Sequence, residues 1–345
     1  MTQKLKTAVL LTGAAARISQ EVAMLDMLMD PKRCGLKLSQ DDTLIAGFSS
    51  GSLNLAAINA CFSTGSQLGW DTYYKQTVLF PLRNKDVYKI KFPPFDTTPL
   101  RNTIQTFVDK MNCKKVGDLA FYSYILACSK EENKTLWACS QNPGDEYLNI
   151  TDTFMASTAI PILFPPQEIS SEAGQPREFP DGYFVDGGTL GTFDGFDSYL
   201  GQYVRQNEPF ENMYIISPMR QTAKAEREGI MMMLKDQKME GLDLLGGKLE
   251  QIIEWIAKFL EKISMNTFMT FLKALNAWTY NGQKMAKNIY ISIPQMDKNF
   301  FIIDFDLEKK QYDAVTDWVG ANPDKLAIPI DEFLKMNEGL MVEEQ

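Results

Sequence analysis

The amino-acid sequence predicts an α/β protein with a mainly parallel central sheet, and two strand–turn–helix units carry that prediction. Residues 7–12 (TAVLLT) form a continuous apolar run of strand-forming residues, which is typical of a parallel strand buried on both faces. A second apolar run begins at Leu44 and breaks at the turn Gly47-Phe48-Ser49-Ser50-Gly51. Both runs lead through a turn straight into a helical segment, as strands of a parallel sheet do.

The length and composition favour one large domain. The chain has 345 residues, of which 45% are apolar and 11% aromatic, and this is ample for a buried core. No internal repeat or low-complexity linker divides it. We therefore expect a single α/β domain over residues 1–335, with a helical insertion over 220–287 and a mobile acidic tail over 336–345.

The chain contains no histidine, which limits its chemistry. A Ser-His-Asp triad and every His-ligated metal site are excluded, so a serine nucleophile would need a carboxylate or a lysine as its base. The five cysteines have no C-x-x-C spacing, which predicts reduced and mostly buried thiols.

Charge and hydropathy bear on partners and location. The formal charge of −9 argues against a nucleic-acid partner and against electrostatic docking on anionic lipid, so any membrane contact would be mainly hydrophobic. The N-terminal apolar run is too short for a signal peptide, and no later segment approaches the length of a transmembrane helix. We expect a cytoplasmic protein that contacts membranes at most peripherally. Export by a route that needs no cleavable signal is the alternative that the sequence leaves open.

The turn after the first strand, GAAAR at residues 13–17, opens into a helix over residues 19–29 whose apolar positions share one face. The backbone amides of such a turn can face an oxyanion or a phosphate. An alanine-rich turn into a helix is also a common structural feature that binds nothing.

The turn at residues 47–51 has the G-x-S-x-G pattern between a strand and a helix, which predicts a nucleophile elbow. A sharp turn would place Ser49 at its apex, and only glycine at 47 and 51 lets the neighbouring backbone pass without a Cβ clash. Free amides at the start of the following helix, together with its dipole, favour a negative charge developing near the Ser49 hydroxyl. The structural alternative is a Gly/Ser loop that caps a helix.

The middle of the chain mixes helix and strand signals. The aromatic, basic stretch over 70–90 and the KFPPFDTTPL that follows it together predict a surface excursion. The other predicted elements are a helix over 100–111, strands over 122–129 and 136–139, and a short helix from Thr151. Prolines at 161, 165 and 166 end that helix, so it should run into a rigid loop.

Asp186 follows a short apolar strand over residues 183–185 and begins the tight turn Asp186-Gly187-Gly188. An aspartate at the carboxyl end of a strand is where α/β sheets place catalytic groups, although Asp-Gly is also one of the commonest turn dipeptides. Asp181 is likewise followed by glycine and is the competing candidate.

The C-terminal part changes to long helical periodicity. Seven apolar residues between 249 and 263 recur at i, i+3 and i+4, which predicts an amphipathic helix. This region is either a helix pair packed on the core, or a helical lid or membrane-facing segment. The other predicted elements are strands over 213–217, 288–294 and 301–305 and a last helix from Tyr312 that Gly320 ends.

Taken in order, these features resemble the patatin-like phospholipase family, the lipid acyl hydrolases with a Ser-Asp dyad. The matching segments are the turn with Gly13 and Arg17, the elbow at 47–51, the run ASTAIPILFPP at 156–166 and the turn at 186–188. The proline-rich run is the most specific match, because no general turn chemistry requires it. The resemblance extends from about residue 6 to 320, is weakest over 220–287, and implies a patatin-like three-layer α/β/α fold.

The resemblance implies a mechanism. Ser49 would attack the ester carbonyl of a glycerolipid while Asp186 accepts its proton, and water activated by Asp186 would hydrolyse the acyl-enzyme. Desolvation would raise the pKa of Asp186 from its usual value near 4. The implied enzyme is of the phospholipase A or lysophospholipase type, needs no cofactor and no metal, and has as its partner a phospholipid or other glycerolipid at a membrane surface.

The oxyanion hole implied by the resemblance consists of Gly13, Ala14, Ala15 and Arg17, and it departs from the family pattern. The family usually has glycine where this chain has alanine at 14 and 15 and isoleucine at 18. Alanine still supplies an amide, but at a position that requires a positive φ it costs roughly 1–2 kcal/mol. The turn after Gly187 and Gly188 also lacks the asparagine and proline common in the family.

Two other functions are compatible with these residues. One is a catalytically silent patatin-like fold that binds lipid or a protein partner, which the two alanines would explain. The other is an acyltransferase or thioesterase that uses the same dyad. The sequence indicates neither the head group, the acyl position, a protein activator nor the oligomeric state.

Overall fold

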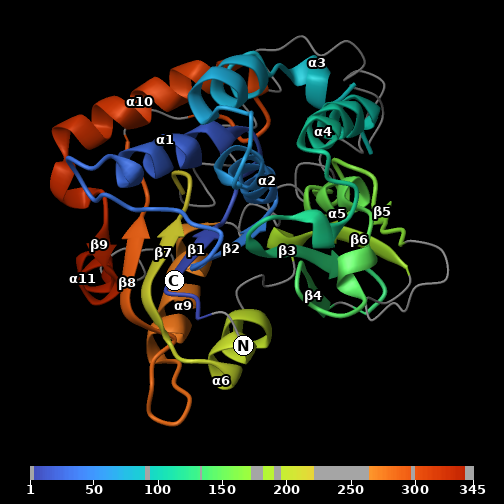
Figure 1. Ribbon diagram of the computed structural model, residues 1–345. Coiled ribbons are helices and arrows are strands. Elements are labelled where there is room, and N and C mark those ends of the chain that lie inside the picture. Colours follow the sequence, from blue (N-terminus) through green and yellow to red (C-terminus); the bar gives the residue numbers. More distant parts are fainter. Residues whose placement is uncertain are drawn as a thin grey trace, which may run out of the picture.

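The computed structural model describes residues 4–89, 94–132, 134–171, 182–189, 196–220, 264–296 and 300–338. Within them, helices cover both faces of a central sheet, which confirms the three-layer α/β/α prediction (Figure 1). The strands are β1 (Thr7–Leu11), β2 (Thr43–Phe48), β3 (Tyr122–Ser129), β4 (Lys134–Cys139), β5 (Gln167–Glu168), β6 (Tyr183–Asp186), β7 (Phe210–Ile216), β8 (Ala286–Ser292) and β9 (Ile328–Pro329). The helices used below are α1 (Ile18–Met29), α2 (Ser50–Phe62), η2 (Trp70–Leu79), α3 (Asn84–Val87), α4 (Thr98–Met111), α5 (Ile150–Ser157), α6 (Gln202–Gln206), α9 (Met265–Ala277), α10 (Glu308–Ala321) and α11 (Ile330–Met336).

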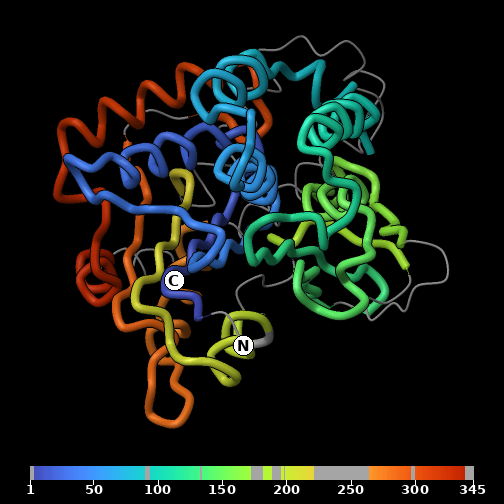
Figure 2. Tube along the Cα trace, viewed as in Figure 1, coloured from blue at the N-terminus to red at the C-terminus, as the bar shows by residue number. Residues whose placement is uncertain are grey.

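The centre of the sheet is parallel and its margins are antiparallel. In the described residues the strand order is β5-β6-β3-β2-β1-β7-β8-β9, with β4 paired to β3. Strand β1 lies parallel to both β2 and β7, although about 200 residues separate β1 from β7; the trace in Figure 2 shows them side by side in blue and yellow. Strands β4, β6 and β9 pair antiparallel with their neighbours. The mainly parallel sheet predicted from the sequence is thus confirmed.

Each face of the sheet has its own apolar core, because side chains of a strand alternate between faces. On β1, Val9 and Leu11 belong to the core under α1, α2 and α10, whereas Ala8 and Leu10 belong to the core under α6, α9 and α11. Figure 1 shows these two helix layers on opposite sides of the strands. Strands buried on both sides explain why their sequences are continuous apolar runs.

The segment 70–79 is a helix packed on the domain, not the predicted surface excursion. This π-helix, η2, lies against α2 and buries Trp70 and Tyr74. The Lys75 ammonium donates to Asp26 Oδ2 at 2.5 Å, and Trp70 Nε1 donates to Asp26 Oδ1 at 2.5 Å. Because Asp26 lies on α1, the partners that hold this segment inward are distant in sequence.

Two C-terminal predictions are also wrong. Residues 301–305 form turns that lead into a short 3-10 helix, and the Ile302 carbonyl accepts from the Ala16 amide at 2.8 Å instead of pairing in the sheet. The edge strand here is β9, which is antiparallel to β8. The helix α10 starts earlier than predicted, at Glu308, and the further helix α11 follows it.

Parts of the predicted helical insertion and tail lie outside the described residues. Of the insertion over 220–287, residues 221–263 are outside them; the part that the structure describes contains α9, whose Phe268 and Leu272 are fully buried. Asp181 and residues 339–345 are also outside them. The choice between a packed helix pair and a lid therefore stays a prediction for most of that insertion.

Candidate active site

Strand β3 brings Ser49 and Asp186 together. The second half of β3 pairs with β4 on one edge, so β2 and β6 share the other edge. On that edge Phe48 of β2 pairs with Leu126. Asp186 of β6 pairs with Ala127, the next residue of β3. Since Ser49 follows Phe48 directly, the sheet register places the Ser49 turn beside the end of β6.

Ser49 occupies a strained turn between β2 and α2. Its φ of 53° and ψ of −139° are rare for a residue with a side chain. Glycine on both sides permits this turn, because a Cβ at Gly47 would lie 2.8 Å from the Gly51 carbonyl oxygen and a Cβ at Gly51 would overlap the Leu11 carbonyl. The turn also ends at the start of α2, where backbone amides have no helical partner. The backbone here is the sharp strand-to-helix turn that the sequence predicts.

Asp186 is fully buried at the end of β6. Its Oδ1 accepts from the Gly188 amide at 2.8 Å. Burial raises the pKa of the Asp186 carboxyl to about 7, and hydrogen bonds from the Gly188 amide and the Ser49 hydroxyl oppose part of that rise. An aspartate with a pKa near 7 beside a serine hydroxyl is a better proton acceptor than an ordinary aspartate.

One short segment after α5 anchors both of these residues. The Ser157 carbonyl accepts from the Ser49 amide at 3.1 Å, and the Ala159 carbonyl accepts from the Asp186 amide at 2.9 Å. Both carbonyls belong to the run ASTAIPILFPP, the most specific of the matching segments, whose structural role cannot be inferred from the sequence. The structure supplies the reason, because this run holds the two ends of strands in register with each other.

The turn before α1 has two left-handed residues. Gly13 has a φ of +56° and Ala15 a φ of +46°, whereas Ala14 is extended with a φ of −169°. At Gly13 a Cβ would lie 2.6 Å from the Phe48 carbonyl oxygen, so only glycine fits there. Of the two alanines that replace family glycines, Ala15 therefore carries the conformational cost and Ala14 does not.

Most amides of this turn are already in use. Gly13 N donates to Glu21 Oε1 (2.7 Å), Ala14 N to Ser50 Oγ (3.1 Å), Ala16 N to the Ile302 carbonyl (2.8 Å) and Arg17 N to the Ala14 carbonyl (3.0 Å). Within the residues that the structure describes, the Ala15 amide makes no hydrogen bond. Ala15 lines the same pocket as Ser49, so its amide is the member of this turn best placed to bind a substrate oxygen.

Arg17, the fourth predicted oxyanion residue, is directed at other groups. Its fully buried guanidinium donates from Nε to the Phe300 carbonyl and from Nη1 to the Met219 carbonyl, each at 2.9 Å. It therefore ties two distant segments to the start of α1.

Gly187 and Gly188 shape the turn after Asp186: a Cβ at Gly187 would lie 2.6 Å from Leu126 Cγ.

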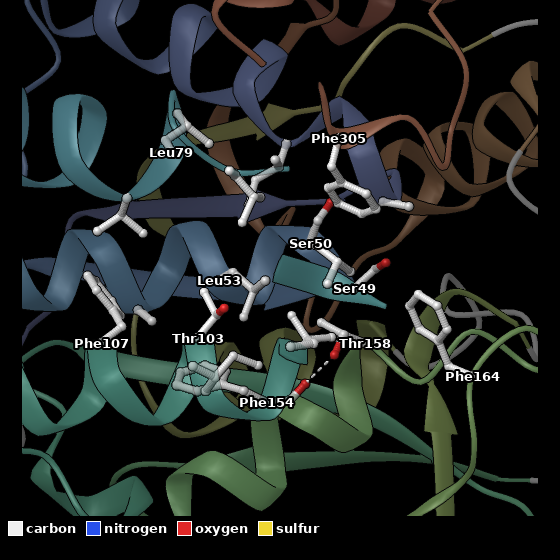
Figure 3. Close-up of a pocket in the computed structure, with 18 of the residues that line it drawn as sticks. Ser49, Ser50, Leu53, Leu79, Thr103, Phe107, Phe154, Thr158, Phe164 and Phe305 are labelled. Atoms are coloured by element: carbon white, nitrogen blue, oxygen red, sulfur yellow. Dashed lines mark hydrogen bonds between the residues drawn. The ribbon is translucent and has the colours of Figure 1, made fainter. Parts of the chain in front are cut away.

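An apolar pocket extends from Ser49 between α2 and α4. Along α2 it is lined at positions 49, 50, 53 and 56, and along α4 at positions 100, 103, 104 and 107, the spacing of one helix face. Figure 3 shows Ser49 and Phe107 far apart in this pocket, with Leu53 and Thr103 between them. Seven residues of helix span about 10 Å, so the pocket offers an apolar channel of that order leading away from the Ser49 hydroxyl.

The described residues offer neither a cluster of metal ligands nor a membrane-spanning helix. In that part of the chain, no three cysteine, aspartate or glutamate side chains are grouped so that they could hold a metal ion. Nor does any helix in those residues have the length and apolar character needed to cross a bilayer. The five cysteines all lie in described residues and form no disulfide with one another, and three of them are buried.

The fold and the site define a class of protein: a three-layer α/β/α protein with a serine at a strand-to-helix turn and an aspartate at the adjoining strand end. The family model of patatin-like phospholipase matches residues 11–210, a span that contains both side chains. The match covers more than half of the chain, and the protein belongs to the patatin-like phospholipase family. Members of this family are generally lipid acyl hydrolases and act on lipid substrates.

The similarity to individual proteins is low. No curated protein matches this chain. Among solved structures the chain is similar to VipD from Legionella pneumophila, with 12% identity over 90% of this chain and 67% of that chain and a TM-score of 0.34. At that score the likeness to VipD carries no further conclusion about this protein.

Proposed function

We propose that this protein hydrolyses carboxylic esters of glycerolipids, as a phospholipase A or lysophospholipase, with Ser49 as nucleophile and Asp186 as general base and acid. The observation that carries this proposal is the fully buried Asp186 at a strand end beside the Ser49 turn, where burial raises its pKa to about 7. Because the chain contains no histidine, the proposed base would act on the Ser49 hydroxyl without an imidazole between them.

The proposed reaction has two halves. In the first, Ser49 Oγ attacks the ester carbonyl carbon as its proton passes to the Asp186 carboxylate; the ester C–O bond then breaks, and the leaving alcohol takes that proton. In the second, Asp186 removes a proton from water, the hydroxide attacks the acyl-Ser49 carbonyl, and the proton returns to Ser49 Oγ as the acid leaves.

The developing oxyanion needs donors near Ser49. We assign the Ala15 amide to this role, supported by the free amides at the start of α2, which begins at Ser50. Gly13 and Ala14 shape the loop, since their own amides are bound to Glu21 and Ser50. The acyl chain of the substrate would occupy the apolar pocket between α2 and α4, which is lined almost wholly by hydrocarbon.

Labelling with a fluorescent fluorophosphonate tests the proposal. We expect the wild type to be labelled, Ser49→Ala not to be labelled, and Asp186→Asn to be labelled at least a hundredfold more slowly. Ser63→Ala, which removes a hydroxyl just beyond α2 and outside the pocket, is the matched control and should label like the wild type. Full esterase activity in Ser49→Ala would overturn the proposal.

A second candidate is a catalytically silent fold that binds lipid in the same pocket. The observation that favours it is the positive φ of Ala15, where the family usually has glycine. A folded wild type that binds a fluorescent fatty acid, resists the fluorophosphonate and gains labelling in Ala15→Gly would support the silent fold.

A further inference from the structure

Glu21 is a fully buried carboxylate that lies directly beneath the turn before α1. Its Oε1 accepts from the Gly13 amide at 2.7 Å, and its Oε2 accepts from Asn54 Nδ2 at 2.9 Å. The mechanism above does not use this carboxylate. Burying a carboxylate costs free energy unless its oxygens accept hydrogen bonds. Two donors from different parts of the chain therefore indicate that this site is specifically arranged to hold the Glu21 carboxylate.

The hydrogen bonds continue from Glu21 to the wall of the pocket. Asn54 lies on α2, is itself buried, and donates from Nδ2 to the Ile18 carbonyl at 3.2 Å as well as to Glu21. Its Oδ1 accepts from the Tyr74 hydroxyl at 2.7 Å. Tyr74 belongs to η2 and lines the apolar pocket. A continuous chain Tyr74–Asn54–Glu21–Gly13 therefore joins the pocket wall to the turn.

The position of Gly13 sets the position of the whole turn relative to Ser49. Its Cα packs so closely on the elbow that an added Cβ would lie within 3 Å of the Phe48 carbonyl and of the Ser50 and Gly51 amides. Two residues later, Ala15 holds its strained left-handed backbone. A local turn with that strain persists only where its neighbours fix it, and the Glu21 carboxylate and the Ser50 hydroxyl bind the two preceding amides.

The two donors favour the ionised form of the Glu21 carboxyl, because each of its oxygens accepts a hydrogen bond. Both the Gly13 amide and the Asn54 amide group donate, so both side-chain oxygens at position 21 must accept. Glutamine offers one acceptor and one donor in the same volume, so it would oppose the Asn54 amide group with a second donor. Burial raises the pKa of the Glu21 carboxyl to about 7, and the hydrogen bonds from Asn54 and Gly13 and the charge of Arg220 oppose part of that rise, so the ionised form predominates at pH 8.

We propose that Glu21 is a positioning residue for the reaction: by accepting the Gly13 amide while fixed by Asn54 and Tyr74, it holds the turn so that the Ala15 amide stays available to the substrate oxygen. This inference rests on the proposed function of Ser49 and Asp186. Glu21 does not touch the substrate, so its loss should act on the turnover rate and leave binding of the acyl chain nearly unchanged.

The test compares Glu21→Gln with Glu308→Gln. Glu308 is the matched control, because it is also fully buried against α1, where it accepts from the Ser19 amide, and within the described residues no hydrogen bond joins it to residues 13–17 or to Asn54. With a soluble ester at pH 8, we expect kcat to fall 10- to 100-fold in Glu21→Gln with KM within twofold of the wild type, and kcat to change less than threefold in Glu308→Gln. Tyr74→Phe, which removes only the far hydroxyl, should lower kcat two- to fivefold and serves if Glu21→Gln does not fold.

Hydrogen–deuterium exchange of the peptide that contains residues 13–17 reports on the turn without any substrate. Faster exchange there in Glu21→Gln, or in Tyr74→Phe, than in Glu308→Gln supports the positioning role. Unchanged exchange, or an equal loss of kcat in the two glutamate variants, overturns it. The Ser49→Ala variant distinguishes failure of the positioning role from failure of the proposed function. If turnover survives in Ser49→Ala, the proposed function fails. The exchange data still decide whether Glu21 holds the turn.

Discussion

At the scale of single residues, Asp186 combines full burial with the proposed role of a base, which requires a negative charge. Desolvation makes ionisation harder, and the amide of Gly188 and the hydroxyl of Ser49 make it easier. The balance leaves the pKa near 7, where a carboxylate can both remove a proton from Ser49 and give it back to an alcohol. Desolvation alone would raise the pKa further, and hydrogen bonding alone would lower it, so either effect by itself would produce a poorer acid–base group near pH 7.

This pKa predicts the pH dependence of the reaction. Asp186 must be ionised to act as a base, so kcat/KM for a soluble ester should rise about tenfold per pH unit below pH 7 and level off above it. A pH–rate profile from pH 5 to 9 checks this expectation. A plateau that persists down to pH 5 would show that a group with an ordinary carboxylate pKa is the base.

The same pKa predicts a change in stability. Because the folded pKa of about 7 exceeds the unfolded value near 4, the native state binds this proton more tightly, and its contribution to stability is lost as pH rises from about 4 to 7. Asp186→Asn does not ionise, so it should gain about 2–4 kcal/mol of unfolding free energy relative to wild type between pH 5 and 8. Urea unfolding at both pH values measures this gain, and Asp313→Asn on the surface of α10 should show none.

Ala15 gives a prediction about backbone strain. Alanine at a φ of +46° costs about 1–2 kcal/mol, whereas glycine there adds about 0.5–1 kcal/mol of unfolded-state entropy. Ala15→Gly should therefore raise the unfolding free energy by up to about 1 kcal/mol. Ala16→Gly, at the next position of the same 3-10 helix (Ala15–Arg17), is the control and should lower it by about 1 kcal/mol. Thermal unfolding of the two variants decides the matter, and a destabilised Ala15→Gly would contradict the strain argument.

At the scale of elements, α2 and α4 face each other across the pocket, so residues on their facing sides control its length. Leu53 lies between Ser49 and the far end at Phe107 (Figure 3). Leu53→Trp should leave turnover of four-carbon esters within twofold of wild type and lower turnover of twelve-carbon esters at least tenfold. Met111→Trp, at the end of α4 outside the pocket, is the control; a uniform loss for all chain lengths in Leu53→Trp would argue against an acyl channel.

The elements that sequence reasoning predicted are those whose signals are local. Strands such as β1 and helices such as α1 are set by apolar runs and by their own periodicity. The sequence does not predict that the helix η2 packs inward, because two of the partners of its Lys75, Asp26 and Tyr312, are distant in sequence, while Asp71 is its local ion-pair partner. The segment 301–305 has the apolar content of a strand, but its burial comes from covering the turn at Ala16 instead of from pairing.

The candidate site shows the same division. The residue types at Ser49 and Asp186 and the glycines around them are visible in the sequence, because steric crowding at a turn restricts which residues fit. The support from Glu21 and Asn54, and the anchoring by the Ser157 and Ala159 carbonyls, depend on backbone atoms and on contacts across elements. No side-chain pattern encodes them, so only the structure shows them.

At the scale of the whole molecule, the charge of −9 sets how the protein would meet a lipid surface. Long-range attraction to anionic lipid is absent, so hydrolysis of zwitterionic vesicles should equal or exceed hydrolysis of vesicles with 30% anionic lipid. Raising the salt concentration from 0.05 to 0.5 M should narrow that difference, because screening weakens the repulsion. Fatty-acid release from the two vesicle types measures both effects, and a strong preference for anionic vesicles would point to a local basic site.

The anchoring of Ser49 and Asp186 by one short stretch of chain has a consequence for motion. Their amides are bound by carbonyls only two residues apart, Ser157 and Ala159. A displacement of this stretch, whether by thermal fluctuation or by a lipid pressing on the loop, moves the serine and the aspartate in the same direction. We therefore expect their separation to vary less than the position of either one, so that the proposed proton path between them stays short while the surroundings rearrange around a substrate.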